Sequence, residues 1–451
     1  MDNRGRFGSR VGIILASAGS AVGLGNIWRF STEVGRNGGA AFILVYFCFV
    51  LFLALPVMVG EFVIGRASKA NTVDAYRKLA PGKPWFLAGY LGVLSGFMVL
   101  SFYSVVAGWT LHYSCASLLN RLSGEQDFAA LFTTFVEHPL RPFLFMLVFL
   151  LLTHYVVARG VQEGIERFSK WMMPLLFLII LFLVGCSLSM PGAREGLRYL
   201  LQPDFSKITT GVVLSAVGQA FFSLSVGIGC MLTYASYFSR ESQLVPSAFK
   251  ICLIDTLVAV LSGFIIFPAV FSVEGISVDA GPGLVFITLP NVFNAAFGTL
   301  PVVGYCFSLL FYVLLLLAAL TSSISMHEIC TAFIHERFHM SRHWAAAIVT
   351  ALCVILGAAC SLSFGIWKGV TLGGMTFFDL FDYATAKFLM PLGGIMITLF
   401  VGWGIDRKRV MDELTNEGSG HRTMAQVLFF LLRWVAPIGV AIIFINGLIG
   451  N

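Results

Sequence analysis

Charged residues are scarce in this chain: they make up 12% of its 451 residues, whereas 58% are hydrophobic. Soluble domains of ordinary composition carry about a quarter of their residues as Asp, Glu, Lys and Arg. The low charge therefore argues against a soluble globular protein. Cysteine provides no disulfide or metal framework either, because none of the nine cysteines stands in a CxxC pair. We interpret them as small hydrophobic residues.

What is abundant is glycine and phenylalanine, with 46 and 43 residues, a mixture typical of closely packed helices in lipid. The net charge of +6 does not indicate a nucleic-acid partner, because the basic residues are scattered through short loops. We expect an all-α polytopic membrane protein whose surroundings are the lipid bilayer, with no obligate protein partner evident.

Long apolar runs predict about 11 membrane-spanning helices of about 20 or more residues each. The stretch 282–298 is apolar but short and contains Pro290, so we expect a surface or re-entrant helix there. The predicted spans are 11–35, 40–64, 86–119, 141–158, 167–190, 211–238, 248–273, 301–335, 344–363, 371–404 and 424–448.

Basic residues are unevenly divided between the two sets of loops. The loops on the N-terminal side hold most of them, including the groups at 4–10, 66–83 and 407–409, and the opposite loops hold far fewer. The positive-inside rule then predicts a cytoplasmic N-terminus and, with an odd number of spans, an external C-terminus.

Two predicted spans are interrupted by glycine and small polar residues, at 18–26 in the first span and at 222–229 in the sixth. Such stretches can be explained by close helix packing. Because both stretches open one half of an apparent 5+5 arrangement, they instead favour two unwound helices and a binding site at mid-membrane.

Four motifs carry a resemblance to a known family: GSAVGLGNIWRF (19–30), ARGVQEGIERFSKWMMP (158–174), GQAFFSLSVGIG (218–229) and LTSS (320–323). The chain resembles neurotransmitter:sodium symporters, and in particular bacterial sodium-coupled transporters of hydrophobic amino acids. The resemblance implies the LeuT fold, a 5+5 inverted repeat, and location in a bacterial inner membrane. It also implies one transport domain over 1–451, with repeats at about 8–190 and 208–404 and an extra helix at about 424–448.

The family likeness implies sites for two sodium ions. The first would use Ala21, Asn26, Ser223 and Asp255; the family usually has Asn where Asp255 stands. The second would use Gly19, Val22, Ala318, Thr321 and Ser322. Alternatively, the hydroxyls of Thr321 and Ser322 bond the carbonyls one turn back, as is common in membrane helices.

The same likeness implies a pocket for an amino acid. Monoamine-carrying relatives have an aspartate at the position of Gly23, so an uncharged Gly23 favours a ligand that brings its own carboxylate. Tyr103 and a helix N-terminus would bind that carboxylate, and the uncharged wall favours a hydrophobic side chain, aliphatic or aromatic. The pocket is predicted to contain Ala21, Gly23, Gly25, Val99, Tyr103, Phe222, Ser225, Ile228, Ser322, Ser325 and Met326.

Two gates are also implied. Arg29 would pair with Asp382 on the outside, with Asp379 as the fallback partner, and Arg4 would pair with Glu336 on the cytoplasmic side. Phe7 stands where the family has a tryptophan latch.

These features predict a sodium-coupled symporter that imports a neutral, hydrophobic L-amino acid by alternating access. We expect Asp255 to replace chloride, so that none is required. A sodium-independent exchanger or proton-coupled permease of the same fold is the alternative, and an amino acid sensor is a weaker one. No enzyme is expected, and the histidines in 327–343 are interpreted as loop residues or packing partners.

Overall fold

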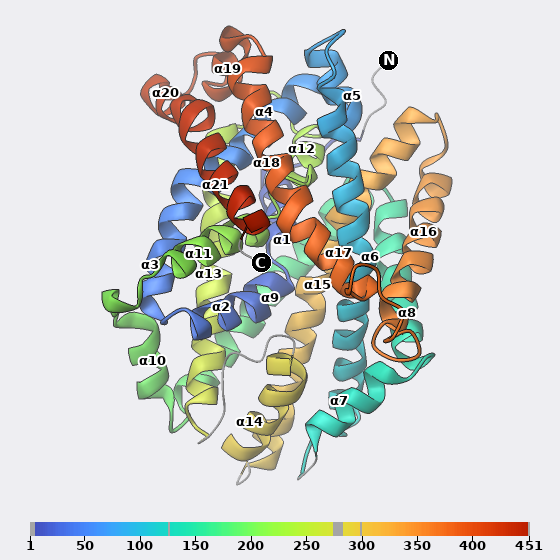
Figure 1. Cartoon of the computed structure of the whole chain (residues 1–451), viewed down its shortest axis with the longest axis vertical. Coiled ribbons are helices and arrows are strands. Elements are labelled where there is room, and N and C mark those ends of the chain that lie inside the picture. The colour runs from blue at the N-terminus through green and yellow to red at the C-terminus, as the bar shows by residue number, and fades with distance from the viewer. Residues whose placement is uncertain (1–4, 125–126, 274–282, 298–299, 450–451) are drawn as a thin grey trace.

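The computed structural model describes residues 5–124, 127–273, 283–297 and 300–449. Within these ranges the chain is almost entirely helical and contains no β-strand (Figure 1). All nine cysteines lie in the described ranges as free thiols; five of them are buried, one is half-buried, and Cys48, Cys115 and Cys306 are exposed.

The first five predicted spans are all present, and three of them contain π-helical turns. They are formed by α1 (Arg10–Ala21) and α2 (Phe30–Arg36), joined by π-helical Gly25–Arg29; α3 (Ala40–Phe49) and α4 (Leu55–Ser68), joined by π-helical Val50–Ala54; α6 (Phe86–Leu118); α8 (Arg141–Ala158); and α9 (Arg167–Leu188), preceded by π-helical Val161–Glu166.

The remaining spans follow in the same order. They are formed by α11 (Thr210–Ser223) and α12 (Cys230–Ala235); α13 (Leu244–Val270); α15 (Pro301–Arg337); α16 (Arg342–Leu362); α17 (Phe377–Tyr383) and α18 (Met390–Leu399), joined by π-helical Ala384–Leu389 and continued by π-helical Phe400–Gly404; and α20 (Arg422–Phe430) and α21 (Ala436–Ile449), joined by π-helical Leu431–Val435.

Short helices connect these spans. The helices α5 and α19 lie at one end of the molecule, and α7, α10 and α14 lie at the other (Figure 1). This separates the loops predicted to be cytoplasmic from those predicted to be external. The connecting elements are α5 (Thr72–Leu79), α7 (Phe128–Glu137), α10 (Ala193–Leu201), the 3-10 turn Phe205–Lys207, π-helical Leu284–Thr288 with α14 (Leu289–Ala296), and α19 (Arg407–Leu414).

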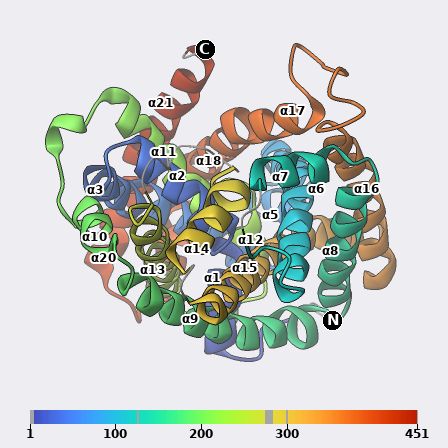
Figure 2. The same cartoon turned by 90° about the horizontal axis from the view of Figure 1, so that it is seen from below.

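Nine helices of the described residues are long and apolar enough to cross a membrane, and the pair α1 and α2, bent by 57°, makes a tenth. The remaining predicted span, the sixth, is split into α11 and α12, and neither piece is long enough alone. The predicted surface helix is α14, which packs on α13 and α15 and lies in front of the central helices in Figure 2.

Both predicted interruptions are breaks in the helices. The helix α1 ends at Ala21, and Val22 is extended, with φ −67° and ψ 110°. After α11, residues 224–229 form turns in which Gly227 and Gly229 have φ of 90° and 85°, values that favour glycine. A Cβ on Gly227 would lie 2.4 Å from the Met390 carbonyl oxygen, so this segment also needs glycine for its close contact with α18.

Backbone groups freed by unwinding inside a membrane must find partners. The fully buried Glu61 of α4 is the partner of two such groups. Its carboxylate accepts hydrogen bonds from the N–H groups of Gly227 at 2.7 Å and Leu232 at 2.9 Å. Gln219 donates to the Gly25 carbonyl at 3.2 Å. These bonds hold the two broken stretches in place between the long helices α6 and α15 and the helices α4 and α13.

Candidate substrate and ion site

The residues predicted for the first sodium site meet in the protein interior. Asp255 of α13 accepts hydrogen bonds from the Asn26 amide at 2.7 Å and the Ser223 hydroxyl at 2.8 Å, and all three residues are buried. The Asn26 side-chain oxygen in turn accepts the Gly23 N–H at 2.9 Å. One cluster therefore joins both broken helices to α13.

No basic side chain of the described residues compensates the charge of this cluster. Asp255 is in no ion pair within the described part of the chain, and a buried carboxylate without a cation is costly. The buried Tyr46 hydroxyl lies beside the cluster, close to Ser223 and to the Thr256 hydroxyl of α13. Oxygen atoms of this kind, with one carboxylate, fit a small hard cation such as Na⁺.

The residues predicted for the second sodium site also lie together. The Ser322 hydroxyl of α15 is 2.9 Å from the Val22 carbonyl oxygen, and the Thr321 hydroxyl is 3.4 Å from the same atom and 3.0 Å from the Ala318 carbonyl oxygen. A Cβ on Gly19 would be 3.2 Å from the Cβ of Thr321. Thr321 also bonds the Leu317 carbonyl one turn back at 3.1 Å, so the alternative structural role is realised for Thr321, whereas Ser322 bonds the Ser20 and Val22 carbonyls of the first span.

Between the two clusters lies a narrow cavity of about 30 Å³. Of the predicted pocket residues, only Ser325 is absent from its wall. That hydroxyl donates to the Ser322 carbonyl at 2.8 Å, and the Cys230 thiol approaches it at 3.6 Å, because Ser325 faces α12 rather than the cavity. The wall consists of Ala21, Gly23, Leu24, Gly25, Val99, Tyr103, Phe222, Ser223, Ser225, Ile228, Ser322, Met326 and Met390.

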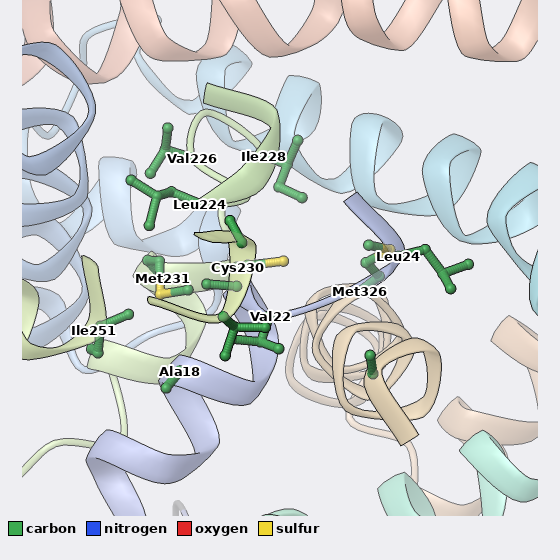
Figure 3. Close-up of a cluster of buried hydrophobic side chains, with 14 of the residues drawn as sticks. Ala18, Val22, Leu24, Leu224, Val226, Ile228, Cys230, Met231, Ile251 and Met326 are labelled. Atoms are coloured by element: carbon green, nitrogen blue, oxygen red, sulfur yellow. The ribbon is translucent and has the colours of Figure 1, made fainter. Parts of the chain in front are cut away.

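Two of these wall residues, Leu24 and Met390, were not foreseen from the sequence. Leu24 lies between the two predicted glycines, and its position inside the GLG run could have suggested it. Met390 follows a π-helical turn of the tenth span, where nothing in the sequence fixes its direction. Figure 3 shows the broken end of α1, with Val22 and Leu24, facing the turns that carry Leu224, Val226 and Ile228.

The polar end of the cavity is formed by the broken α1 and by Tyr103. The Leu24 N–H donates to the Tyr103 hydroxyl at 3.3 Å. A Cβ on Gly23 would lie 2.5 Å from the Ser322 hydroxyl oxygen, and a Cβ on Gly25 would lie 2.8 Å from the Phe222 ring. The two glycines therefore keep this end open to a ligand that approaches the backbone.

The predicted outer ion pair is not formed. The Arg29 guanidinium lies over the Phe222 ring, 4.1 Å from its centroid, and is in no ion pair with Asp382 or Asp379 within 4.0 Å among the described residues. Asp379 instead accepts the Thr376 hydroxyl at 2.7 Å, at the N-terminus of α17. The aromatic face takes the place of the carboxylate as the contact of Arg29.

At the opposite end, Glu336 accepts the backbone N–H of Asn71 at 2.9 Å. Its predicted partner Arg4 lies outside the described residues. Phe7 is buried against three rings, Tyr234, Tyr237 and Phe238, with centroids 5.8–6.2 Å away. It therefore holds the N-terminal segment against the end of α12.

A charged cluster next to this latch was not foreseen. The fully buried Glu328 accepts the Tyr237 hydroxyl at 2.6 Å and forms a two-contact ion pair with Arg342. It links the end of α12 to α15 and α16. Glu328 and Arg342 were recognisable as charges near a span end, but their pairing depends on how three helices meet.

Residues 335–339 read HERFH, which matches the HExxH pattern of zinc peptidases. That pattern needs both histidines on one helical face. Here α15 ends at Arg337, and His339 has a left-handed φ of 53°, so the two side chains do not share a face. In the described residues no group of three His, Cys, Asp or Glu could hold a metal. His335 lies in the last turn of α15, not in the loop, and approaches the Met340 carbonyl at 2.5 Å, as a packing partner.

Comparison with known proteins identifies the class. The model of the sodium:neurotransmitter symporter family matches residues 4–136 and 136–450. The chain therefore belongs to this family, and it is a sodium-dependent transporter.

Individual relatives agree. The chain is 42% identical to YhdH, an uncharacterized sodium-dependent transporter of Bacillus subtilis. The alignment of 447 residues covers 98% of this chain and 97% of YhdH. It is 26% identical to the sodium-dependent serotonin transporter of Drosophila melanogaster, over 99% of this chain and 77% of that one.

A solved structure confirms the predicted fold. The crystal structure of MhsT in complex with L-phenylalanine superposes with a TM-score of 0.90 at 41% identity, covering 99% of this chain and 100% of MhsT.

Proposed function

We propose that this protein imports a neutral, hydrophobic L-amino acid together with sodium by alternating access. The observation that carries the proposal is the cavity between the broken helices. No charged residue is on its wall, its polar groups gather at the broken end of α1, and Val99, Ile228, Met326 and Met390 supply apolar surface. A zwitterion with an apolar side chain matches this division.

The ligand's carboxylate would accept hydrogen bonds at the end where the Leu24 N–H and Tyr103 hydroxyl now meet. A cavity of about 30 Å³ has room for about one water, so an amino acid side chain would have to displace wall residues. Two methionines on the wall suit this, because their unbranched side chains repack readily. The bound L-phenylalanine of MhsT supports a ligand of this class.

Two sodium ions would enter with each amino acid. One would bind Asn26, Ser223, Asp255 and the Ala21 carbonyl; the other would bind Thr321, Ser322 and the carbonyls of Gly19, Val22 and Ala318. Each ion supplies about 1.4 kcal/mol per tenfold gradient and about 2.3 kcal/mol per 100 mV of membrane potential. Two ions would concentrate a neutral substrate by roughly five decades.

No chloride would be required. Two sodium ions and a zwitterion leave excess positive charge near the first site, and the carboxylate of Asp255 offsets it there. Its bonds to Asn26 and Ser223 place this charge among the proposed ligands, which supports the proposal.

Transport would proceed by movement of spans 1, 2, 6 and 7 against spans 3, 4, 8 and 9. The breaks between α1 and α2 and between α11 and α12 would supply hinges in the moving group. We further propose a bacterial inner-membrane location with a cytoplasmic N-terminus and an external C-terminus, and one domain with repeats at about 8–190 and 208–404.

The deciding experiment measures binding of each of the twenty amino acids to purified protein, in sodium and in potassium. We expect sodium-dependent binding of hydrophobic members. Equal binding in both salts would instead favour an exchanger or proton-coupled permease, and binding without uptake in liposomes would favour a sensor. No binding of any member would refute the proposal.

A further inference from the structure

One arginine lies within a membrane span and takes no part in the proposed transport site. Arg433 is in the π-helical turn between α20 and α21, packed against Gly402 at the end of the tenth span. Its guanidinium lies 5.3 Å from the ring centroid of Trp403, 5.6 Å from Trp434 and 6.0 Å from Phe429. A second cation, Arg407, lies over Phe429 at 5.5 Å.

Neither arginine has an acidic partner among the residues that the structure describes. Arg433 and Arg407 form no ion pair or hydrogen bond within the described ranges, and the Arg433 Nε is buried with no acceptor. A cation within a membrane span is expensive and normally paired. Aromatic rings stabilise the charge but leave its N–H groups without an acceptor.

The direction of the Arg433 side chain indicates where a hydrogen-bond acceptor for its guanidinium would lie. Side chains lean toward the N-terminus of their helix, and α20 begins beside α19, at the end of the molecule that carries Arg407 and Arg422 (Figure 1). The Arg433 side chain is therefore directed toward the lipid headgroups at the end of the molecule that carries Arg407 and Arg422. Trp403 and Trp434, both about half exposed, are suited to that interface.

An apolar groove of about 440 Å³ begins at Trp434 and continues away from the arginines. Its two sides are Cys48 and Phe52 in the second span and Ile438, Gly439 and Ile442 on α21. Phe52, Ile438 and Ile442 are more than half exposed. The groove thus extends a charged, aromatic site toward the middle of the membrane.

We propose that Arg433, Arg407 and this groove form a binding site for one anionic phospholipid. The phosphate accepts from the two guanidinium groups, and an acyl chain lies in the groove. A second copy of the chain fits this site less well, because in a symmetric dimer the face that carries Arg433 would pack against the same face of the partner. The helices on that face, 40–54 and 431–449, contain no Asp or Glu to accept from Arg433.

The test titrates purified protein in detergent with phosphatidylglycerol or phosphatidylcholine of identical acyl chains. Bound lipid is counted by native mass spectrometry and Tm is recorded. We expect tighter binding of phosphatidylglycerol. Arg433→Gln should weaken it about fivefold, the effect of about one cation near a phosphate surface, and leave phosphatidylcholine unchanged. Arg407→Gln should also weaken phosphatidylglycerol binding. Because Arg407 is exposed, this variant serves as the test if Arg433→Gln folds poorly.

Arg159→Gln is the matched control, because Arg159 also stacks on an exposed ring, Tyr155 at 4.1 Å, but is not part of the groove. It should keep wild-type binding. Cys48→Trp, which fills the groove, should weaken both lipids.

The proposal fails if wild type does not distinguish the two lipids, or if Arg159→Gln loses as much as Arg433→Gln. It also fails if soluble glycerophosphate raises Tm as much as the lipid, or if lipid-free protein is a dimer that Arg433→Gln separates.

Discussion

Asp255→Asn removes one negative charge from the first ion site while keeping the shape of the side chain. The carboxylate is fully buried and bonded to Asn26 at 2.7 Å and Ser223 at 2.8 Å. The amide retains one oxygen ligand, so the variant isolates the charge rather than the contact.

The size of the effect follows from the geometry. Two opposite unit charges about 4 Å apart attract by about 4 kcal/mol at an effective dielectric constant of about 20. The cost of burying the carboxylate cancels part of this attraction. We therefore expect a net loss of about 1–3 kcal/mol, which is roughly a 5- to 150-fold weaker apparent sodium affinity.

The assay is sodium-dependent binding of a labelled amino acid, repeated with chloride replaced by gluconate. Wild type should bind equally in both anions, and Asp255→Ser should become sensitive to chloride, because a small neutral side chain leaves the excess positive charge uncompensated. Asp379→Asn, which changes an acid that within the described ranges is bonded only to Thr376, is the control and should match wild type. Unchanged sodium affinity in Asp255→Asn, or a wild type that needs chloride, would refute the reasoning.

Three further predictions follow from the same contacts. Thr321→Ala with Ser322→Ala should abolish sodium-dependent uptake in protein that still reaches the membrane, because both hydroxyls face the Val22 carbonyl; retained sodium dependence would locate the second site elsewhere. Leucine should compete with labelled tryptophan whereas tryptamine should not, since the Gly23 end offers N–H and O–H donors but no anion; equal competition by tryptamine would contradict the pocket assignment. Glu61→Gln should lower Tm in a thermal-shift assay, because Gly227 and Leu232 donate to different carboxylate oxygens and the variant replaces one of these with an NH2 group that cannot accept, and a buried unsatisfied group costs about 1–3 kcal/mol; an unchanged Tm would mean that water or repacking replaces the lost bond.

The sequence predicted the features that depend on single residue types. Glycines at 227 and 229 and small residues at 18–26 indicated where helices would break, and the backbone breaks in both places. The family likeness implied that Asp255, an acid inside a span, lies with Asn26 and Ser223, and the three side chains do lie together. In such cases the cost of an unusual residue in lipid is itself the signal.

Features that depend on the meeting of distant helices could not be predicted in this way. Glu61 was not singled out, because its role appears only when α4 lies against the turns after α11. Met390 enters the cavity wall because a π-helical turn changes the direction of the residues that follow it. Sequence periodicity assumes a regular helix, so each π-helical turn rotates the helix face away from the expected one.

Arg29 shows how the same limit affects the interpretation of a gate. The family likeness implied Asp382 of the tenth span as the partner of Arg29, with Asp379 as the fallback, and no aromatic partner was predicted. The arginine lies over Phe222, which also forms part of the cavity wall. The guanidinium therefore packs on a residue of the cavity wall, so we expect the movements of Phe222 and Arg29 to be coupled. Opening toward this side would have to separate the cation from the ring, move both together with α11, or transfer Arg29 to Asp382. The last route would make the ion pair a feature of a different conformation of the same gate.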